Sequence, residues 1–107
     1  MFTINGVEWS IRFVLPKSPF LMRDDGSFSI GMSDANTNTV YLSSKLHGAM
    51  LEKVLCHELT HCLMLSYKIE MPIEMEEWLC DFMANYGKTV IYLLDNILCG
   101  MKSRDVA

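Results

Sequence analysis

The segment EKVLCHELTHCLML, residues 52–65, is the most informative part of the chain, because it combines an apolar helical pattern with three polar groups. His57, Glu58 and His61 form the pattern H-E-x-x-H within it. Apolar residues recur at intervals of three and four, the periodicity of an amphipathic helix. They are Met50, Leu51, Val54, Leu55, Leu59, Leu63 and Met64. The sequence therefore predicts a helix that starts near Lys45 and carries two imidazoles and a carboxylate.

The residues before this helix predict β-structure. Asn5-Gly6 stands between apolar residues, which is a strong signal for a two-residue hairpin turn. Residues 7–15 then alternate apolar and polar side chains, as a half-buried strand does. The same alternation returns at residues 28–32, and TVYLS at 39–43 is a further short strand. Together they predict a small antiparallel sheet of three or four strands.

The residues after the central helix predict two more helices. Pro72 suits the first turn of a helix, and the acidic residues that follow it favour the positive end of the helix dipole. This second helix is expected to be interrupted or ended by Gly87. The segment 89–100 predicts a third helix that stops at its terminal glycine, and residues 101–107 are expected to form a frayed tail.

Length and composition place the chain among folded α+β domains. A chain of 107 residues forms one domain, residues 1–107, and 50% apolar with 21% charged residues is ordinary for a folded protein. The formal charge of −4 and the scattered basic residues argue against a nucleic-acid partner. The longest apolar run, VIYLL, is far shorter than the ~18 residues of a membrane span. Without a secretion signal, the four cysteines are expected to be free thiols in the cytoplasm.

The spacing of the two histidines indicates a metal site. His57 and His61 are four residues apart, so on a helix their rings project from one face, one turn from each other. Two imidazole nitrogens placed in this way can reach one zinc ion at about 2.0–2.1 Å. Glu58 lies beside the first histidine, close enough to act on a zinc-activated water without binding the metal. This is the arrangement of zinc metallopeptidases.

The sequence leaves the third ligand open. A catalytic zinc site takes three protein ligands, and the second helix offers Glu74, Glu76 and Glu77. Glu76 and Glu77 lie on or beside the inner face defined by the apolar periodicity, whereas Glu74 lies nearer the solvated start. The periodicity alone does not choose between Glu76 and Glu77.

HELTH followed by EWLCDFMA resembles the gluzincin arrangement, in which a glutamate on a second helix is the third zinc ligand. More closely, it is similar to the ImmA/IrrE family of small metallopeptidases, whose second helix carries E-x-x-A-N-x-F-A. The resemblance covers about residues 38–87, with Cys80 and Asp81 standing where the family has Ala and Asn. It implies Glu77 as the zinc ligand and Asp81 as a partner that orients a ligating histidine ring.

We therefore expect a zinc-dependent metallopeptidase that hydrolyses peptide bonds of a protein or peptide substrate, with Glu58 as the general base. An exposed edge at residues 39–43 would bind an extended peptide by strand addition. Tyr41, Tyr67 and Tyr86 are all candidates for stabilising the oxyanion, and the sequence does not choose among them.

A second hypothesis belongs to a different class. A zinc-stabilised binding or regulatory module would keep His57 and His61 but would have no use for Glu58. The presence of Glu58 favours catalysis. The sequence does not indicate an oligomeric state.

Overall fold

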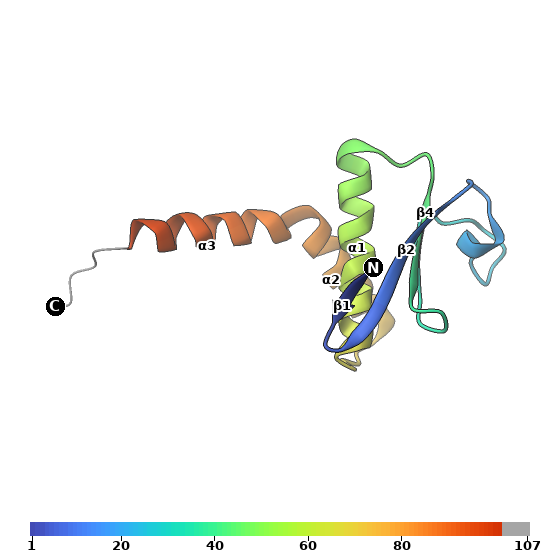
Figure 1. Cartoon of the computed structure of the whole chain (residues 1–107), viewed down its shortest axis with the longest axis horizontal. Coiled ribbons are helices and arrows are strands. Elements are labelled where there is room, and N and C mark those ends of the chain that lie inside the picture. The colour runs from blue at the N-terminus through green and yellow to red at the C-terminus, as the bar shows by residue number, and fades with distance from the viewer. Residues whose placement is uncertain (102–107) are drawn as a thin grey trace.

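The computed structural model describes residues 1–101 and has an α+β architecture, which confirms the predicted fold class. A four-stranded sheet is covered on one face by helix α1, a second helix α2 lies along α1, and a third helix α3 projects away from this body (Figure 1). The tail predicted beyond Met101 lies outside the described residues.

Three strands agree with the predicted segments, whereas the third strand of the chain begins three residues later than the predicted residues 28–32 and extends into the residues expected to form a loop. The bounds of the strands are β1 (Phe2–Ile4), β2 (Val7–Val14), β3 (Gly31–Asp34) and β4 (Thr39–Ser43). The hairpin turn at Asn5-Gly6 is confirmed: β1 and β2 pair antiparallel with Ile4 opposite Val7. Both turn residues have positive φ, 48° for Asn5 and 77° for Gly6, as the twist of a two-residue hairpin requires.

The order of the strands differs from the expected arrangement in one respect. The sheet runs β1-β2-β4-β3, and β4 pairs parallel with β2 but antiparallel with β3. The sheet is therefore mixed. The prediction that residues 39–43 form an exposed edge is wrong, because β4 has a partner strand on each side. The strand at the edge of the sheet, beside α1 and α2, is β3. The prediction failed because side-chain alternation shows which face of a strand is buried but not which strands are its neighbours.

Helix α1 (Gly48–Ser66) confirms the predicted central helix, and its Leu51, Val54 and Leu55 pack against the core of the sheet. Met50 and Leu63, which share the predicted apolar pattern, are exposed. Val40 and Leu42 of β4 pack with Trp9 of β2 and Cys62 of α1, and all four are at most 1% exposed. A short 3₁₀ helix, η1 (Pro19–Leu21), covers part of the opposite face of the sheet, where Phe20 stacks on Tyr41 with ring centroids 4.6 Å apart.

Two buried polar contacts fix the C-terminal end of α1 against the first hairpin. The indole N–H of Trp9 donates a hydrogen bond to the Ser66 hydroxyl at 2.8 Å. The side-chain amide of Asn5 donates to the backbone carbonyl of the same serine at 3.1 Å. A buried indole N–H without an acceptor is costly, so these contacts fix the position of α1 along the sheet.

The remaining helices form one continuous rod with an irregular turn. Helix α2 (Ile73–Phe82) follows directly after Pro72, as predicted. Residues Met83–Gly87 form a π-helical turn, and α3 (Lys88–Gly100) continues from it. The backbone keeps helical angles through this turn, so Gly87 interrupts the α-helical pattern without ending the rod.

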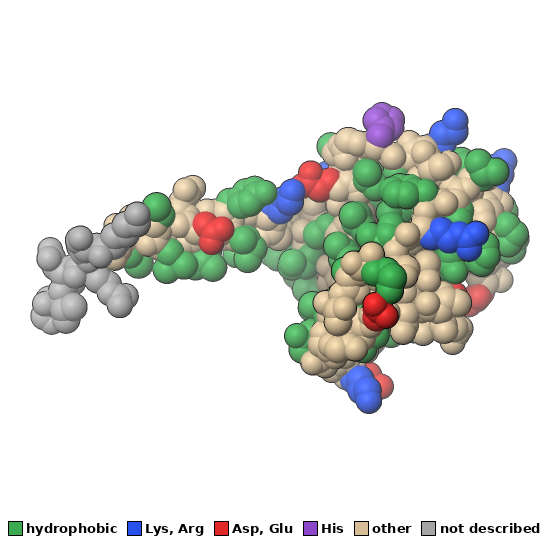
Figure 2. Space-filling model, in the orientation of Figure 1, with side chains coloured by type: hydrophobic (Ala, Val, Ile, Leu, Met, Phe, Trp, Pro, Cys, Tyr) green, Lys and Arg blue, Asp and Glu red, His purple; other side chains and the backbone are tan. Residues whose placement is uncertain are grey.

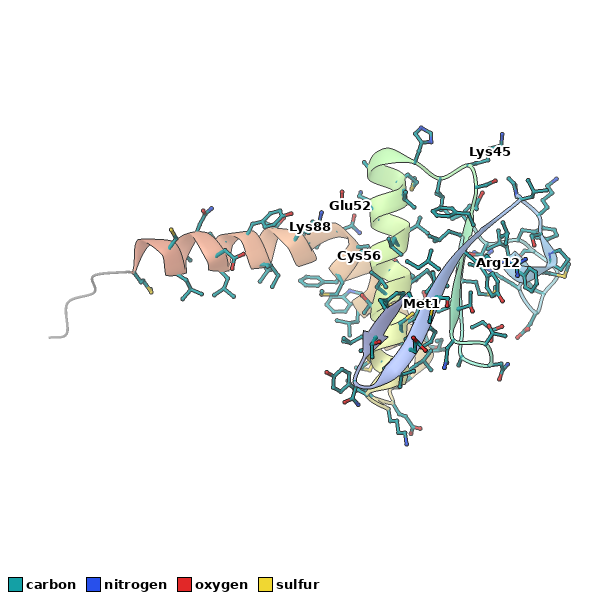
Figure 3. All side chains as sticks on the ribbon, in the orientation of Figure 1. Met1, Arg12, Lys45, Glu52, Cys56 and Lys88 are labelled. Atoms are coloured by element: carbon teal, nitrogen blue, oxygen red, sulfur yellow. The ribbon has the colours of Figure 1, made fainter. Side chains whose placement is uncertain are left out.

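Helix α3 gives the chain an elongated shape. The radius of gyration is 16.8 Å, whereas a compact domain of this length has about 13 Å. Apolar side chains cover much of the projecting arm (Figure 2). An ion pair between Lys88 Nζ and Glu52 Oε1, 2.6 Å apart, joins the base of α3 to α1 (Figure 3). Within residues 1–101, no helix is both long enough and apolar enough to cross a membrane.

Gly31 allows β3 to lie close to α1, which leads to a prediction about stability. A Cβ at this position would lie 2.7 Å from Cγ1 of Val54 and 3.3 Å from Cγ of Glu58. Val54 has a stiff side chain, so we expect Gly31→Ala to destabilise the fold by about 1–3 kcal/mol. Urea unfolding measures the effect. Gly100→Ala is the control, because nothing lies within 4 Å of its Cβ position; equal stability of the two variants would contradict the close approach.

Candidate metal centre

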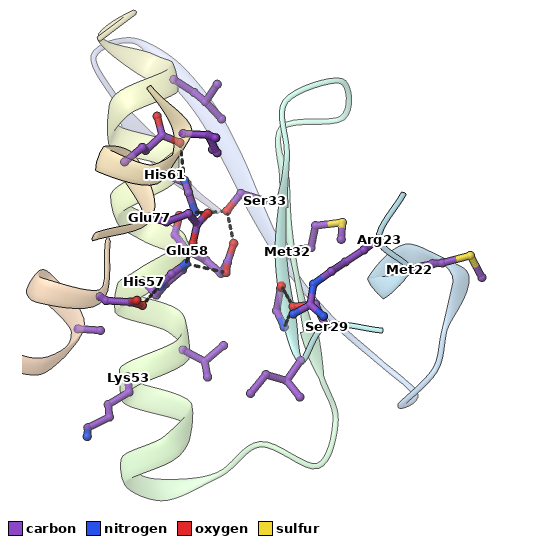
Figure 4. A pocket seen from close by; sticks show the side chains of 18 of the residues that line it. Met22, Arg23, Ser29, Met32, Ser33, Lys53, His57, Glu58, His61 and Glu77 are labelled. Atoms are coloured by element: carbon purple, nitrogen blue, oxygen red, sulfur yellow. Dashed lines mark hydrogen bonds and ion pairs between the residues drawn. The ribbon is translucent and has the colours of Figure 1, made fainter. Parts of the chain in front are cut away.

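The two histidines of the motif project from α1 toward α2, on the side where β3 forms the edge of the sheet (Figure 4). Their ring centroids are 5.0 Å apart. His57 and His61 are partly buried, with 20% and 13% of the side-chain surface exposed. The four-residue spacing therefore brings both rings to one site, as predicted.

Carboxylates from α2 orient each ring through its Nδ1 atom. Nδ1 of His57 lies 2.8 Å from Oδ1 of Asp81, and Nδ1 of His61 lies 2.7 Å from Oε2 of Glu76. An ionised carboxylate only accepts hydrogen bonds, so each Nδ1 carries a proton and donates it. In a neutral ring this leaves a lone pair on Nε2, which is the form of imidazole that binds metals.

Both Nε2 atoms point at the same carboxylate, that of Glu77. Nε2 of His61 is 2.9 Å from Oε1, and Nε2 of His57 is 3.2 Å from Oε2. Two neutral rings and one carboxylate would place acceptors against acceptors, which is favourable only when protons or a cation stand between them. Ligand atoms of one tetrahedral zinc lie about 3.3 Å apart, so the donor set His57, His61 and Glu77 fits a zinc ion.

Cys80 is a further potential ligand. One ligand atom from each of His57, His61 and Cys80 lies within 4.8 Å of the other two, so this group also is close enough to hold a metal ion. Its thiol is fully buried. Burial, and to a smaller extent the nearby carboxylates of Glu77 and Glu76, raise the pKa of this thiol to about 12. Without a metal the thiol is therefore protonated at neutral pH.

The carboxylate of Glu58 lies beside the His57 ring and accepts a hydrogen bond from Ser33 of β3. Its Oε2 is 3.9 Å from Nε2 of His57. The Ser33 hydroxyl lies 2.9 Å from Oε1 and 3.0 Å from the backbone carbonyl of the same glutamate, and donates its proton to this pair of acceptors. The thiol of Cys62 in turn donates to the Ser33 oxygen at 3.7 Å. Oε1 is thus occupied, and Oε2 faces Nε2 of His57.

The π-turn keeps Asp81 in place. Two side chains donate hydrogen bonds to backbone carbonyls in and next to this turn. The Asn85 amide donates to the Asp81 carbonyl at 2.8 Å, and the Cys56 thiol donates to the Met83 carbonyl at 3.4 Å. The second of these bonds crosses from α1, so the turn is tied to the helix that carries the histidines.

The site opens into a cleft of about 850 Å³ between α1, α2 and the edge strand β3. Ile30, Met32 and Ser33 line the wall that includes β3, and Leu65 and Ile73 add apolar surface near the helices. A cleft of this size is in the range that accommodates a ligand, and here one wall carries the unpaired edge of a strand.

Sequence reasoning found part of this site. The structure brings His57, His61 and Glu77 together and places Asp81 against Nδ1 of His57. Glu76, which the sequence left open as an alternative third ligand, instead contacts Nδ1 of His61. Ser33 was missed, because it follows the predicted strand at residues 28–32, whereas in the structure it lies within β3. Of the tyrosines considered as oxyanion partners, none lines the cleft; they are Tyr41, Tyr67 and Tyr86.

The comparisons with known proteins identify no relative. No family model matches the chain, no curated protein matches it, and no solved structure matches it.

The burial of two cysteines predicts their reactivity. Alkylation needs the thiolate, and burial raises the pKa of Cys62 to about 11 and that of Cys80 to about 12. At neutral pH in metal-free protein, we expect both to react with iodoacetamide at least ~100-fold more slowly than exposed Cys99. Peptide mass spectrometry measures the rates, and labelling in urea is the control. Comparable rates for Cys80 and Cys99 in the folded protein would contradict the described packing.

Proposed function

We propose that this protein is a zinc-dependent metallopeptidase with a minimal zincin core. His57, His61 and Glu77 hold the zinc, and Glu58 is the general base. The observation that carries the proposal is the convergence of two Nε2 atoms on the Glu77 carboxylate while both Nδ1 atoms are bound by other carboxylates. A coincidental pair of core histidines would not need all these partners.

Glu77 is a better third ligand than Cys80 for two reasons. Its oxygens lie 2.9 and 3.2 Å from the two Nε2 atoms, as ligands of one ion do. It also needs no deprotonation in a buried place, whereas the Cys80 thiol is fully buried among carboxylates. Two imidazoles and one carboxylate suit zinc, and three protein ligands leave a position open for chemistry.

The chain's own groups supply the proton transfers of peptide hydrolysis. Zinc held here would polarise the scissile carbonyl and acidify a water molecule. Oε2 of Glu58 takes a proton from the attacking water, whose oxygen bonds to the carbonyl carbon. The same oxygen of Glu58 then delivers that proton to the amine nitrogen as the C–N bond breaks. Ser33 keeps Oε1 occupied, so Oε2 stays directed at the reacting groups.

The cleft supports a protein or peptide as the substrate. Within residues 1–101, strand β3 has no partner strand on its cleft side, and its backbone can pair with an extended chain. Such pairing would lay the substrate along β3, next to Glu58. Strand β3, and not residues 39–43 as expected from the sequence, is therefore the proposed strand for binding an extended peptide.

The resemblance to the ImmA/IrrE family remains part of the proposal. It rests on HELTH and on the positions of Glu77 and Asp81, whose contacts with the histidines support it. The four unpaired cysteines support a reducing compartment, the cytoplasm. We propose no nucleic-acid partner, because the basic residues form no cluster in the sequence.

One observation favours the alternative, a zinc-binding regulatory module without activity. If Cys80 joined the two histidines and Glu77, the zinc would have four protein ligands, and closed four-ligand sites are structural. Glu58 argues against this, because its free oxygen faces the ligand atoms and would have no role in a closed site. The two hypotheses differ in what Cys80 contributes.

Zinc binding by single variants separates these ligand sets. We expect Glu77→Ala to weaken zinc binding by at least ~100-fold, above the usual loss when only an orienting partner is removed. Cys80→Ala should keep one zinc per chain, and Glu74→Ala is the control for removing an exposed carboxylate from the same helix. Competition with a chelator measures the affinities. Loss of zinc from Cys80→Ala, with retention by Glu77→Ala, would contradict the proposed ligands.

The general base is tested by Glu58→Gln, which keeps the shape of the side chain but cannot accept the proton. We expect zinc to stay bound and peptide cleavage to fall by at least ~100-fold. Cleavage is measured by mass spectrometry as new chain ends in a peptide mixture from denatured proteins, which offers many different sequences at once. Glu74→Gln should cleave like the parent. Absence of cleavage by the zinc-loaded parent, or full activity of Glu58→Gln, would contradict the mechanism.

A further inference from the structure

Helix α3 has an apolar side that no described part of the chain covers. With 3.6 residues per turn, its large aliphatic side chains share a continuous arc of about 160°. They are Val90, Ile91, Leu93, Leu94, Ile97, Leu98 and Met101, each between 48% and 57% exposed. Among the described elements, α3 has extensive contacts only with the π-turn from which it continues. Figures 1 and 2 show it projecting from the body.

The direction of α3 is built into the fold. No loop separates it from α2, because the rod continues through Met83–Gly87 with helical backbone angles. The ion pair of Lys88 with Glu52 joins its first residue to α1. A helix of 13 residues is marginal in water on its own, so a partner that covers its apolar arc would stabilise it.

The charges of α3 argue against a lipid surface or a nucleic acid as that partner. Helices that lie on membranes carry lysines and arginines on their polar side. Here the only charged residues are Lys88, already paired with Glu52, and Asp95. The covering surface must therefore be apolar and uncharged. A second copy of α3 has these properties and is always present at the same concentration.

The available area matches what a dimer needs. Seven aliphatic side chains, each about half exposed, offer on the order of 600 Å² per chain, so a pair buries about 1,200 Å², the lower end for specific interfaces. We propose that this protein forms a two-fold dimer in which the apolar arcs of two α3 helices pack against each other.

An antiparallel pair is the arrangement the shape allows. Packed helices lie 8–10 Å apart, whereas the chain is 30 by 27 Å across its two shorter axes. Parallel helices would force two bodies into nearly the same place. Antiparallel helices put the bodies at opposite ends and also oppose the helix dipoles.

The test is the mass of the full chain in solution. By light scattering at about 50 µM, where interfaces of this size hold, we expect twice the 12.3 kDa of one chain. Leu94→Glu, at the centre of the arc, should raise the dissociation constant at least ~100-fold. Asn96→Glu adds the same charge on the polar side and should leave the dimer unchanged. Because α3 has extensive contacts only with the π-turn among the described elements, circular dichroism should show both variants folded.

Three results would overturn the proposal. They are a parent chain that is monomeric at this concentration, a Leu94→Glu variant that stays dimeric, and an Asn96→Glu variant that dissociates to the same extent. A monomeric parent that binds vesicles of phosphatidylcholine and phosphatidylglycerol would assign α3 to a membrane surface instead. Small-angle scattering tests the arrangement: the antiparallel dimer is clearly longer than the 61 Å of one chain, and a dimer no longer than this would exclude it.

Discussion

The contacts between the α1 histidines and the α2 carboxylates are the constraint on which the site depends. Spacing along α1 puts His57 and His61 on one face, but it does not set the direction of either ring. Asp81 and Glu76 set these directions by accepting from the two Nδ1 atoms, which leaves both Nε2 atoms facing Glu77. The site therefore requires a fixed position of α2 along α1. The bond from Cys56 to the Met83 carbonyl joins α1 to the turn that follows α2. The contacts of the first hairpin with Ser66 separately fix α1 against the sheet.

The π-turn connects the two unusual features of the molecule. On its N-terminal side it keeps Asp81 against His57, and on its C-terminal side it directs α3 away from the body. Because helical structure is continuous from α2 to α3, the carboxylates of the site and the apolar arc of α3 lie on one helical segment. A dimer formed through α3 would therefore contact the helical segment beyond the C-terminal end of α2. It would leave the cleft beside β3 uncovered.

Local patterns predicted the elements but not all their neighbours. Asn5-Gly6 specified the hairpin, and the spacing of apolar residues specified α1, because both signals depend on residues close in sequence. The parallel pairing of β4 with β2 was missed, since alternation does not encode which strands are adjacent. For the same reason the contact of Ser33 with Glu58, 25 residues away, had no clear signal. Glu76 and Glu77 are adjacent and chemically alike, and only the three-dimensional arrangement shows that they face different nitrogen atoms.

The central claim is that a zinc ion binds to two imidazole nitrogens and the Glu77 carboxylate, with the Cys80 thiol outside the coordination sphere. X-ray absorption at the zinc edge of the zinc-loaded protein tests this directly, because sulfur and nitrogen or oxygen ligands differ in distance and scattering. The account predicts only nitrogen and oxygen at about 2.0–2.2 Å, with the outer scattering of two imidazole rings. A sulfur at about 2.3 Å would contradict it and would assign Cys80 to the metal.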